Sequence, residues 1–263
     1  MSDALYRSMP QSEPDRRRLT TSDGVRLDST LLRGGTPGTT AVVLANGFTG
    51  SWRNPGTRMI ASQLLPVGDV MTFDFRGHHA SDGLCTVGDK EIHDLEAAVG
   101  HLRGLGYTSI ATIGFSMGAA VAVRHAGTFG GVAAVVAVSG PSRWYYRGTR
   151  SMRLLHFGVE RAAGRWFLRT ARKVRVSDRP WDPVPPDPTE LAAEVAPAPL
   201  LIVHGDADSY FPVEHALRIH EAAREPKELW IEPGMGHAER AMTPERAGRI
   251  ADWLSRNLAP ETA

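Results

Sequence analysis

Cysteine is nearly absent from this chain: Cys85 is the only one among 263 residues. A single thiol excludes an intramolecular disulfide and a cysteine-rich zinc or iron–sulfur site. Disulfides are typical of oxidising compartments, so their absence favours a reducing one, and we expect a cytoplasmic protein. The first residues contain no apolar segment typical of a secretory signal, and the polar stretch LTTSDG after Arg16 to Arg18 does not fit a twin-arginine signal.

Net charge and long apolar runs are lacking as well. The 30 Lys and Arg residues nearly cancel the 29 Asp and Glu residues, and the formal charge of +1 argues against a nucleic-acid partner. No apolar run approaches the roughly 18 residues of a membrane-spanning helix. With 42% hydrophobic and 22% charged residues, the chain has enough apolar surface for a full globular core.

Short apolar runs alternate with segments of helical periodicity along most of the chain. A polar tail over residues 1–18 and a half-buried strand over 25–32 come first. The runs typical of strands buried on both faces follow at 41–45, 70–73, 110–113, 132–138, 200–203 and 229–231. The helical segments are 55–65, 90–103, 117–128, 213–223 and 244–258. The alternation predicts an α/β protein, with a mostly parallel sheet and helices on both faces, built from residues 19–141 and 198–263.

One stretch interrupts the alternation. Residues 142–197 contain no strand-like run, but a long helical pattern followed by the proline-rich segment WDPVPPDPTE. Apolar residues from Met152 through Trp166 to Val174 fall near one side of that helical pattern, and arginines line another side. We predict a helical cap in this stretch, closed by a stiff proline linker.

The segment Gly114-Phe115-Ser116-Met117-Gly118 lies directly between a predicted strand and a predicted helix. A sharp strand-to-helix turn needs small residues two positions before and after its centre, and it lifts the central hydroxyl above the sheet edge. The first-turn amides and the helix dipole favour a developing negative charge at that place. Ser116 is therefore predicted to be a nucleophile.

A serine nucleophile needs a base that removes its proton and an acid that orients the base. His237 is the preferred base among ten histidines, because the loop PGMGH places it just after the last predicted strand. Two carboxylates, Asp206 and Asp208, follow the strand at 200–203. We favour Asp208, whose loop position allows it to face His237, and expect Asp206 to hold the loop through local backbone hydrogen bonds.

Acyl transfer also needs donors where negative charge develops on the substrate oxygen. The backbone amide of Met117, just after the serine, is one candidate. The loop NGFTGS over residues 46–51 follows the first buried strand and offers the Phe48 amide as a second candidate, although Asn-Gly also fits an ordinary turn.

Together, GFSMG, NGFTGS, DFRGHHASDG, HGDADSYFP and GMGHAE resemble the α/β-hydrolase superfamily, in the serine-hydrolase branch that has a helical cap after the sixth strand. The resemblance extends over nearly the whole chain. It implies an eight-stranded sheet, a cofactor-free triad of Ser116, Asp208 and His237, and an oxyanion hole formed by the Phe48 and Met117 amides. No metal ion and no nucleotide are expected.

Two positions depart from the family pattern. Asn46 stands where relatives usually have histidine before the oxyanion glycine, and its amide retains hydrogen-bonding capacity. His79 stands where they usually have glycine, so it adds a Cβ at that position. Both are candidates for substrate contact, and neither departure removes a triad residue.

Within this superfamily the nucleophile distinguishes the chemistries. Serine at position 116, in place of aspartate, disfavours epoxide hydrolase and haloalkane dehalogenase activity. We therefore expect hydrolysis of a carboxylic ester or thioester, with a small-molecule acyl substrate, by a monomer or small homo-oligomer. An acyltransferase, perhydrolase or lyase with the same triad also fits, as does a binding protein without activity.

The predicted cap is strongly basic. Residues 143–179 contain eleven Lys and Arg residues against two acidic ones, a net charge of +9. A solvated helix face is the commonest explanation of such a run. Arg161 and Arg165 are candidates to hold an anionic substrate, and Trp144 at the hinge is a candidate for the pocket wall or the core. Contact of a basic amphipathic helix with anionic lipid is a less favoured alternative.

Overall fold

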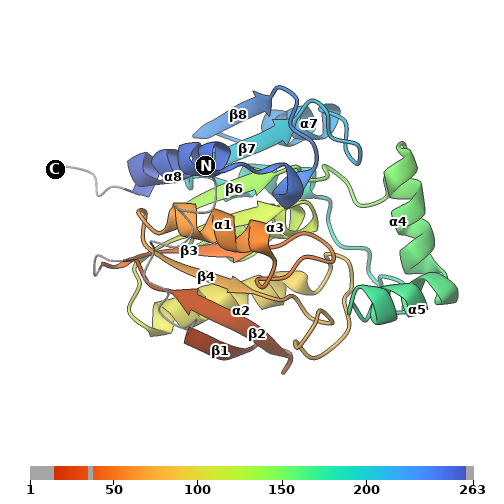
Figure 1. Ribbon diagram of the computed structural model, residues 1–263. Helices are drawn as coiled ribbons and strands as arrows, with labels where there is room; N and C mark the ends of the chain where they lie inside the picture. Colours follow the sequence, from red (N-terminus) through yellow and green to blue (C-terminus); the bar gives the residue numbers. More distant parts are fainter. Residues whose placement is uncertain (1–14, 35–37, 259–263) are drawn as a thin grey trace, which may run out of the picture.

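The computed structural model describes residues 15–34 and 38–258. The strands there form one eight-stranded sheet in the order β1-β2-β4-β3-β5-β6-β7-β8 (Figure 1). They are β1 (Asp15–Thr20), β2 (Arg26–Leu32), β3 (Thr40–Ala45), β4 (Asp69–Phe73), β5 (Ser109–Phe115), β6 (Ala134–Val138), β7 (Leu200–Gly205) and β8 (Lys227–Glu232). β2 pairs antiparallel with β1 and β4, and the other neighbours pair in parallel, which confirms the predicted mostly parallel sheet.

The structure corrects the polar tail predicted over residues 1–18. Residues 15–18 belong to β1, while residues 1–14 lie outside the described part of the chain. Charged residues fill most of β1, which conceals the alternation of its half-buried and exposed positions. An edge strand tolerates such charges because one of its sides has no neighbouring strand.

Helices cover both faces of the sheet, as the strand–helix alternation predicts. α1 (Pro55–Leu64) and α8 (Pro244–Leu258) pack on the face to which Val42 and Leu44 point. The other face, with Ala41 and Val43, is covered by α2 (Glu91–Gly104), α3 (Met117–Phe129) and α7 (Glu214–Ala222). Successive side chains of a strand point to opposite faces, so β3 contributes to both cores.

The connection from β6 to β7 carries α4 (Arg150–Glu160), α5 (Ala162–Ala171), α6 (Pro188–Leu191) and the 3-10 helix η2 (Ala192–Val195). α4 and α5 lie beyond the carboxyl ends of the parallel strands (Figure 1). α6 returns to α3, where a Cβ added to Gly127 would lie 2.5 Å from the Leu191 carbonyl oxygen. The predicted insertion over 142–197 thus has one part that stands away from the sheet and one part that packs beside it.

The long helical pattern predicted in this connection is broken in the structure. Arg161 has extended backbone angles, with φ −100° and ψ 139°, and it separates α4 from α5. Val174 and Val176 lie beyond α5 in isolated β-bridges with the segment that follows β4. Trp166 does not share the buried side of Met152, because its side chain is 68% exposed.

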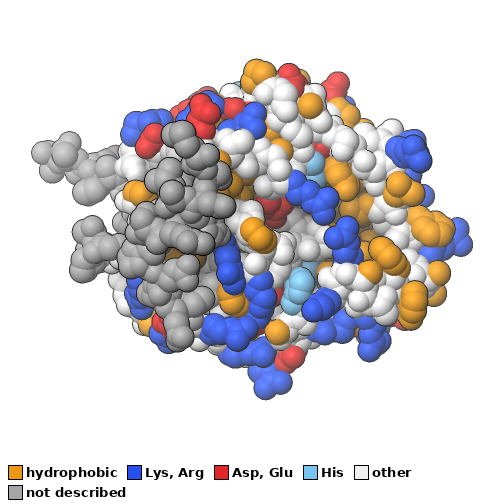
Figure 2. Space-filling model, viewed as in Figure 1, with side chains coloured by type: hydrophobic (Ala, Val, Ile, Leu, Met, Phe, Trp, Pro, Cys, Tyr) orange, Lys and Arg blue, Asp and Glu red, His pale blue; other side chains and the backbone are white. Residues whose placement is uncertain are grey.

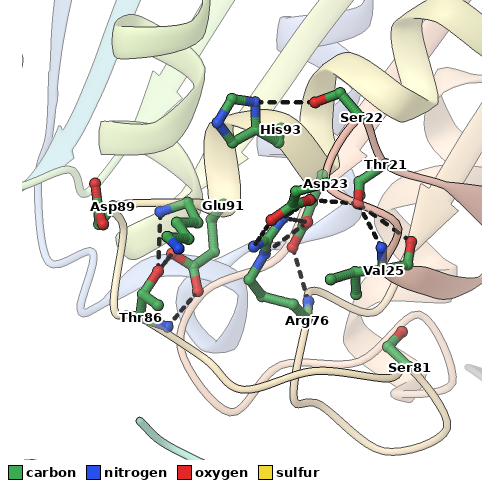
Figure 3. Close-up of polar contacts among 12 residues, drawn as sticks. Thr21, Ser22, Asp23, Val25, Arg76, Ser81, Thr86, Asp89, Glu91 and His93 are labelled. Atoms are coloured by element: carbon green, nitrogen blue, oxygen red, sulfur yellow. Dashed lines mark hydrogen bonds and ion pairs between the residues drawn. The ribbon is translucent and has the colours of Figure 1, made fainter. Parts of the chain in front are cut away.

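A buried polar network supports the segment after β4 (Figure 3). Arg76 donates to Asp94 on α2 over 2.8 Å and to Asp23 in the turn between β1 and β2, also over 2.8 Å. Glu91, at the start of α2, accepts hydrogen bonds from the amide and the hydroxyl of Thr86, each over 2.7 Å. These bonds fix the segment after β4 to α2 and to the β1–β2 turn.

Removing the Arg76 guanidinium should destabilise the fold strongly. Its side chain is 3% exposed and that of Asp94 is 0% exposed, so Arg76→Ala would leave a buried carboxylate without its cation, at a cost of about 3–5 kcal/mol. Urea unfolding measures this loss. The matched control is Arg26→Ala, whose ion pair with Asp82 is exposed and is worth at most about 1 kcal/mol. Equal losses in the two variants would contradict the prediction.

Candidate active site

Ser116 occupies the sharp turn between β5 and α3 that the sequence predicts. Its φ of 52° lies in the left-handed region, which is strained for a side chain with a Cβ. A Cβ on Gly114 would lie 2.1 Å from the Gly118 carbonyl oxygen, and a Cβ on Gly118 would lie 2.3 Å from that of Ala45. Only glycine fits at these two positions, so the two glycines allow the turn that exposes the serine.

The three predicted triad residues meet at the carboxyl ends of β5, β7 and β8. His237 Nε2 lies 2.9 Å from Ser116 Oγ, and His237 Nδ1 lies 2.7 Å from Asp208 Oδ2. The Tyr210 ring stacks on the His237 imidazole with a centroid distance of 4.3 Å. The imidazole is thus held on its edge by a carboxylate and on its face by an aromatic ring.

The side chain of Asp208 is fully buried, and both of its carboxylate oxygens accept hydrogen bonds. Oδ1 accepts from the amides of Tyr210 and Phe211, while Oδ2 faces His237. Burial opposes ionisation, but the His237 ring and the two amides outweigh it and hold the pKa of Asp208 below its ordinary value. Asp206 instead accepts from the Gly234 amide over 2.7 Å, so it ties the β7 loop to the loop that carries His237.

Acid should remove the stability that ionised Asp208 contributes. Because its folded pKa lies below the ordinary value of 3.8, this contribution is complete above that value and is lost as the pH falls through the folded pKa. The difference in unfolding free energy between wild type and Asp208→Asn should therefore be larger at about pH 5 than at about pH 3. Urea titrations at both pH values measure it, and a difference that grows on acidification would contradict the prediction.

The loop over residues 46–51 lies beside the serine, and several of its backbone amides already donate hydrogen bonds. The Gly47 amide donates to Glu239 Oε1 over 2.5 Å, and the Thr49 amide donates to His78 Nε2 over 3.3 Å. Burial lowers the pKa of His78 to about 4, which keeps Nε2 available as an acceptor at neutral pH. In the described part of the chain, neither the intervening Phe48 amide nor the Met117 amide donates a hydrogen bond.

Glu239 is a residue of this site that the sequence reasoning missed. It lies in the 3-10 helix η3 (Ala238–Ala241), two residues after His237, and burial raises the pKa of its carboxyl. A Cβ on Gly47 would lie 3.2 Å from Glu239 Oε2, which shows how closely the carboxylate approaches the loop. Glu239 is the last residue of the motif GMGHAE, so the sequence did contain it. Nothing in the neighbouring residues, however, connects it with Gly47, which lies 192 positions earlier.

Asn46 and Trp144 are engaged inside the protein. Asn46 Nδ2 donates to the Phe73 carbonyl over 3.2 Å, and Oδ1 accepts from Thr57 over 2.8 Å, so the residue joins β3 to β4 and α1. The Trp144 indole donates to the Pro186 carbonyl over 2.9 Å, and its side chain is only 7% exposed. Neither set of contacts supports the predicted role in substrate binding.

The other three candidates lie at the surface or half-buried. Arg165 donates to the Val159 and Glu160 carbonyls and so satisfies the carboxyl end of α4. Arg161 is an exposed residue at the bend between α4 and α5. His79 is half-buried with φ 44°, a conformation that explains why glycine suits this position.

The fold and the site define the class of protein. A sequence profile of the Alpha/beta hydrolase family matches residues 42–253, and the chain belongs to this family. The resemblance seen in the motifs and the α/β-hydrolase fold expected from it are therefore confirmed.

Known proteins similar to this chain include several hydrolases. The esterase Pf2001 of Pyrococcus furiosus is 27% identical, with a TM-score of 0.74 over 94% of this chain and 92% of that protein. The alpha/beta hydrolase GrgF of Penicillium sp. sh18 is 21% identical, with a TM-score of 0.73 over 93% of this chain and 99% of GrgF. At this identity, the similarity establishes only that the two proteins share a fold. The uncharacterized protein YfhR of Escherichia coli (strain K12) is 40% identical over 47 residues, only 18% of this chain and 16% of YfhR.

Proposed function

We propose that this protein is a serine esterase that cleaves a carboxylic ester through an acyl-enzyme on Ser116. The observation that carries the proposal is the continuous hydrogen-bond chain from Ser116 Oγ through His237 to the buried carboxylate of Asp208. Such a chain makes a weak hydroxyl nucleophilic. The similarity to the Pf2001 esterase over most of both chains favours an oxygen ester over a thioester.

Each group has a role in the proposed reaction. Ser116 Oγ attacks the ester carbonyl carbon while His237 Nε2 takes the hydroxyl proton, and Asp208 stabilises the resulting imidazolium. The carbonyl oxygen becomes an oxyanion and accepts hydrogen bonds from the Phe48 and Met117 amides. His237 then gives the proton to the leaving alkoxide, and an alcohol departs.

The second half of the reaction regenerates the enzyme. A water molecule attacks the acyl carbon as His237 takes one of its protons, and collapse of the second tetrahedral intermediate returns that proton to Ser116 Oγ. The products are one carboxylic acid and one alcohol for each ester and water consumed. No step requires a cofactor.

A fluorophosphonate probe tests the nucleophile directly. We expect one phosphonyl group per active chain, located on Ser116 by peptide mass spectrometry, and we expect it to be absent from Ser116→Ala. A panel of acyl esters and acyl thioesters of graded length and charge, with alcohols as competing acceptors, then tests the reaction. Labelling that persists in Ser116→Ala would refute the proposal. If products formed only when an acceptor alcohol was present, the reaction would be acyl transfer and not hydrolysis.

Glu239 has a positioning role in this proposal, because it holds the Gly47 amide next to the proposed oxyanion donor Phe48. Glu239→Ala should lower kcat by about 10- to 100-fold with little change in KM. The reason is that the Phe48 amide would shift, and its hydrogen bond to the oxyanion stabilises mainly the transition state. Glu239→Gln retains an oxygen acceptor and should recover most of the rate. Steady-state kinetics measure both variants.

Glu245→Ala is the matched control for Glu239, because Glu245 is an exposed carboxylate in the first turn of α8. Its kcat and KM should equal those of wild type. If Glu239→Gln lost as much kcat as Glu239→Ala, a side-chain oxygen at position 239 would not be sufficient to hold the Gly47 N–H group. That result would contradict the positioning role.

A further inference from the structure

The helices α4 and α5 form a hairpin that packs mainly on itself. They cross where a Cβ on Gly164 would lie 2.4 Å from the Gly158 carbonyl oxygen, so the two backbones are in close contact. The buried residues of the two helices are Met152 on α4 and Gly164 and Leu168 on α5. In Figure 1 the hairpin projects beyond the carboxyl ends of the strands, and Leu168 joins it to the core on the Ala41 and Val43 face of the sheet. Its outer surface is therefore available to a partner.

The most exposed hydrophobic side chains of the described residues lie on this hairpin or just before it. Among the described residues, the five large hydrophobic side chains with the highest exposure all lie between positions 145 and 167: Trp166 (68%), Leu154 (63%), Tyr145 (61%), Phe157 (59%) and Phe167 (55%). Figure 2 shows hydrophobic side chains gathered over α4 and α5, with Lys and Arg side chains around them. Exposed aromatic clusters of this kind mark interaction sites.

Cationic side chains share the exposed faces with these hydrophobic residues. On α4, Arg150, Arg153, Leu154 and Phe157 follow the spacing i, i+3, i+4 and i+7, which places them on one side of the helix. On α5, Trp166 and Arg169 lie three residues apart and again share a side. A surface that presents arginine beside aromatic and aliphatic side chains suits the boundary between lipid headgroups and acyl chains.

Little acidic charge balances these arginines. The Glu160 carboxylate already contacts Arg147 and His156. Residues 143–179 carry a net charge of +9. Within the described residues, no ion pair involves Arg150, Arg169 or Arg172. The unbalanced charge would oppose a symmetric contact between two copies of the hairpin, because a two-fold axis places equal surfaces opposite each other. An anionic surface is the complementary partner.

We propose that the α4–α5 hairpin docks the protein on an anionic phospholipid surface. Leu154, Phe157, Trp166 and Phe167 enter the headgroup region, while Arg150, Arg169 and Arg172 contact lipid phosphates. Within the described residues, no helix has the length and the hydropathy to cross a bilayer. Docking rests on the exposed hairpin alone and does not depend on the proposed esterase activity.

Vesicle flotation with the full chain tests the proposal. We expect the protein to float with vesicles of phosphatidylcholine and phosphatidylglycerol at 7:3, and the bound fraction to fall about tenfold or more with phosphatidylcholine alone or at 1 M salt. Trp166→Ser/Phe167→Ser should lose binding. Arg150→Gln/Arg169→Gln/Arg172→Gln should weaken it by about tenfold or more.

Two matched controls separate docking from loss of folding. Leu217→Ser removes a side chain that is 50% exposed on α7, and Arg256→Gln removes a cation on α8, both away from the hairpin. Both should bind vesicles as wild type does, and thermal unfolding should show that all variants are folded. Brominated lipids should quench tryptophan emission in wild type but less in Trp166→Ser/Phe167→Ser.

Several outcomes would overturn docking on lipid. One is failure of folded wild type to float with the anionic vesicles, and another is equal flotation with neutral vesicles. A wild-type dimer that Trp166→Ser/Phe167→Ser converts to a monomer, without vesicle binding, would assign the face to a second copy of the chain. Binding to an oligonucleotide in place of vesicles would assign it to a nucleic acid.

Discussion

Ser116→Ala is expected to lower kcat by about a million-fold on any ester that the wild type cleaves. In the proposed mechanism this substitution removes the oxygen that forms the acyl-enzyme, and His237 loses the group whose proton it accepts. Residual turnover of about 10³- to 10⁴-fold over the uncatalysed reaction should remain, because the proposed oxyanion donors, the Phe48 and Met117 amides, are unchanged. Steady-state rates with a chromogenic ester, after removal of any contaminating wild type, measure the loss.

The strained backbone at position 116 provides a second measurement on the same site. Ser116→Gly also lacks the nucleophile, but glycine adopts a φ of 52° without the strain that a Cβ brings. It should therefore be inactive and more stable than Ser116→Ala by about 1 kcal/mol. A kcat within tenfold of wild type in either variant would mean that another residue is the nucleophile.

Asp208→Asn should lower kcat by about 10⁴-fold while KM changes little. The Tyr210 and Phe211 amides donate to Oδ1 and would keep an oxygen at that place in the variant. The asparagine NH2 group would then face His237 Nδ1 and donate to it. His237 would carry its proton on Nε2, where it can no longer accept the Ser116 proton.

Asp206→Asn is the matched control, two residues earlier in the same loop. Asp206 is exposed and accepts from the Gly234 amide through Oδ1, an oxygen that asparagine retains. Its kcat should stay within about threefold of wild type, since exposed substitutions away from the reacting atoms have small effects. Comparable losses in the two variants would contradict the assignment of Asp208 as the acid.

Much of the site could be predicted because its signals are local. Gly114 and Gly118 flank Ser116 within five residues, and the surrounding strand and helix follow from short apolar runs and helical spacing. The bounds of α8 agree with the prediction at both ends, because the apolar stripe is regular and Pro244 marks its first turn. β1 could not be found in this way, since its charged residues conceal a strand that its pairing with β2 and the buried Leu19 stabilise.

The positions of Val174 and Glu239 depend on partners far along the chain, so the first was placed wrongly and the second was missed. Val174 fits a helical stripe in the sequence, but in the fold it meets the segment after β4 as an extended residue. Asn46 and Arg165 carry polar groups suited to a substrate, yet the protein's own backbone and side chains occupy them. Spacing along the chain does not reveal which of several available acceptors or donors will lie nearby.

The sequence by itself determined the α/β class and the turn that presents Ser116, because these depend on neighbours within one or two elements. The tertiary structure alone decided that Glu239 holds the Gly47 amide across 192 positions. It also decided that the hairpin presents Trp166 to solvent. Hydrogen bonding and burial are set by three-dimensional proximity, which only the packed strands and helices establish.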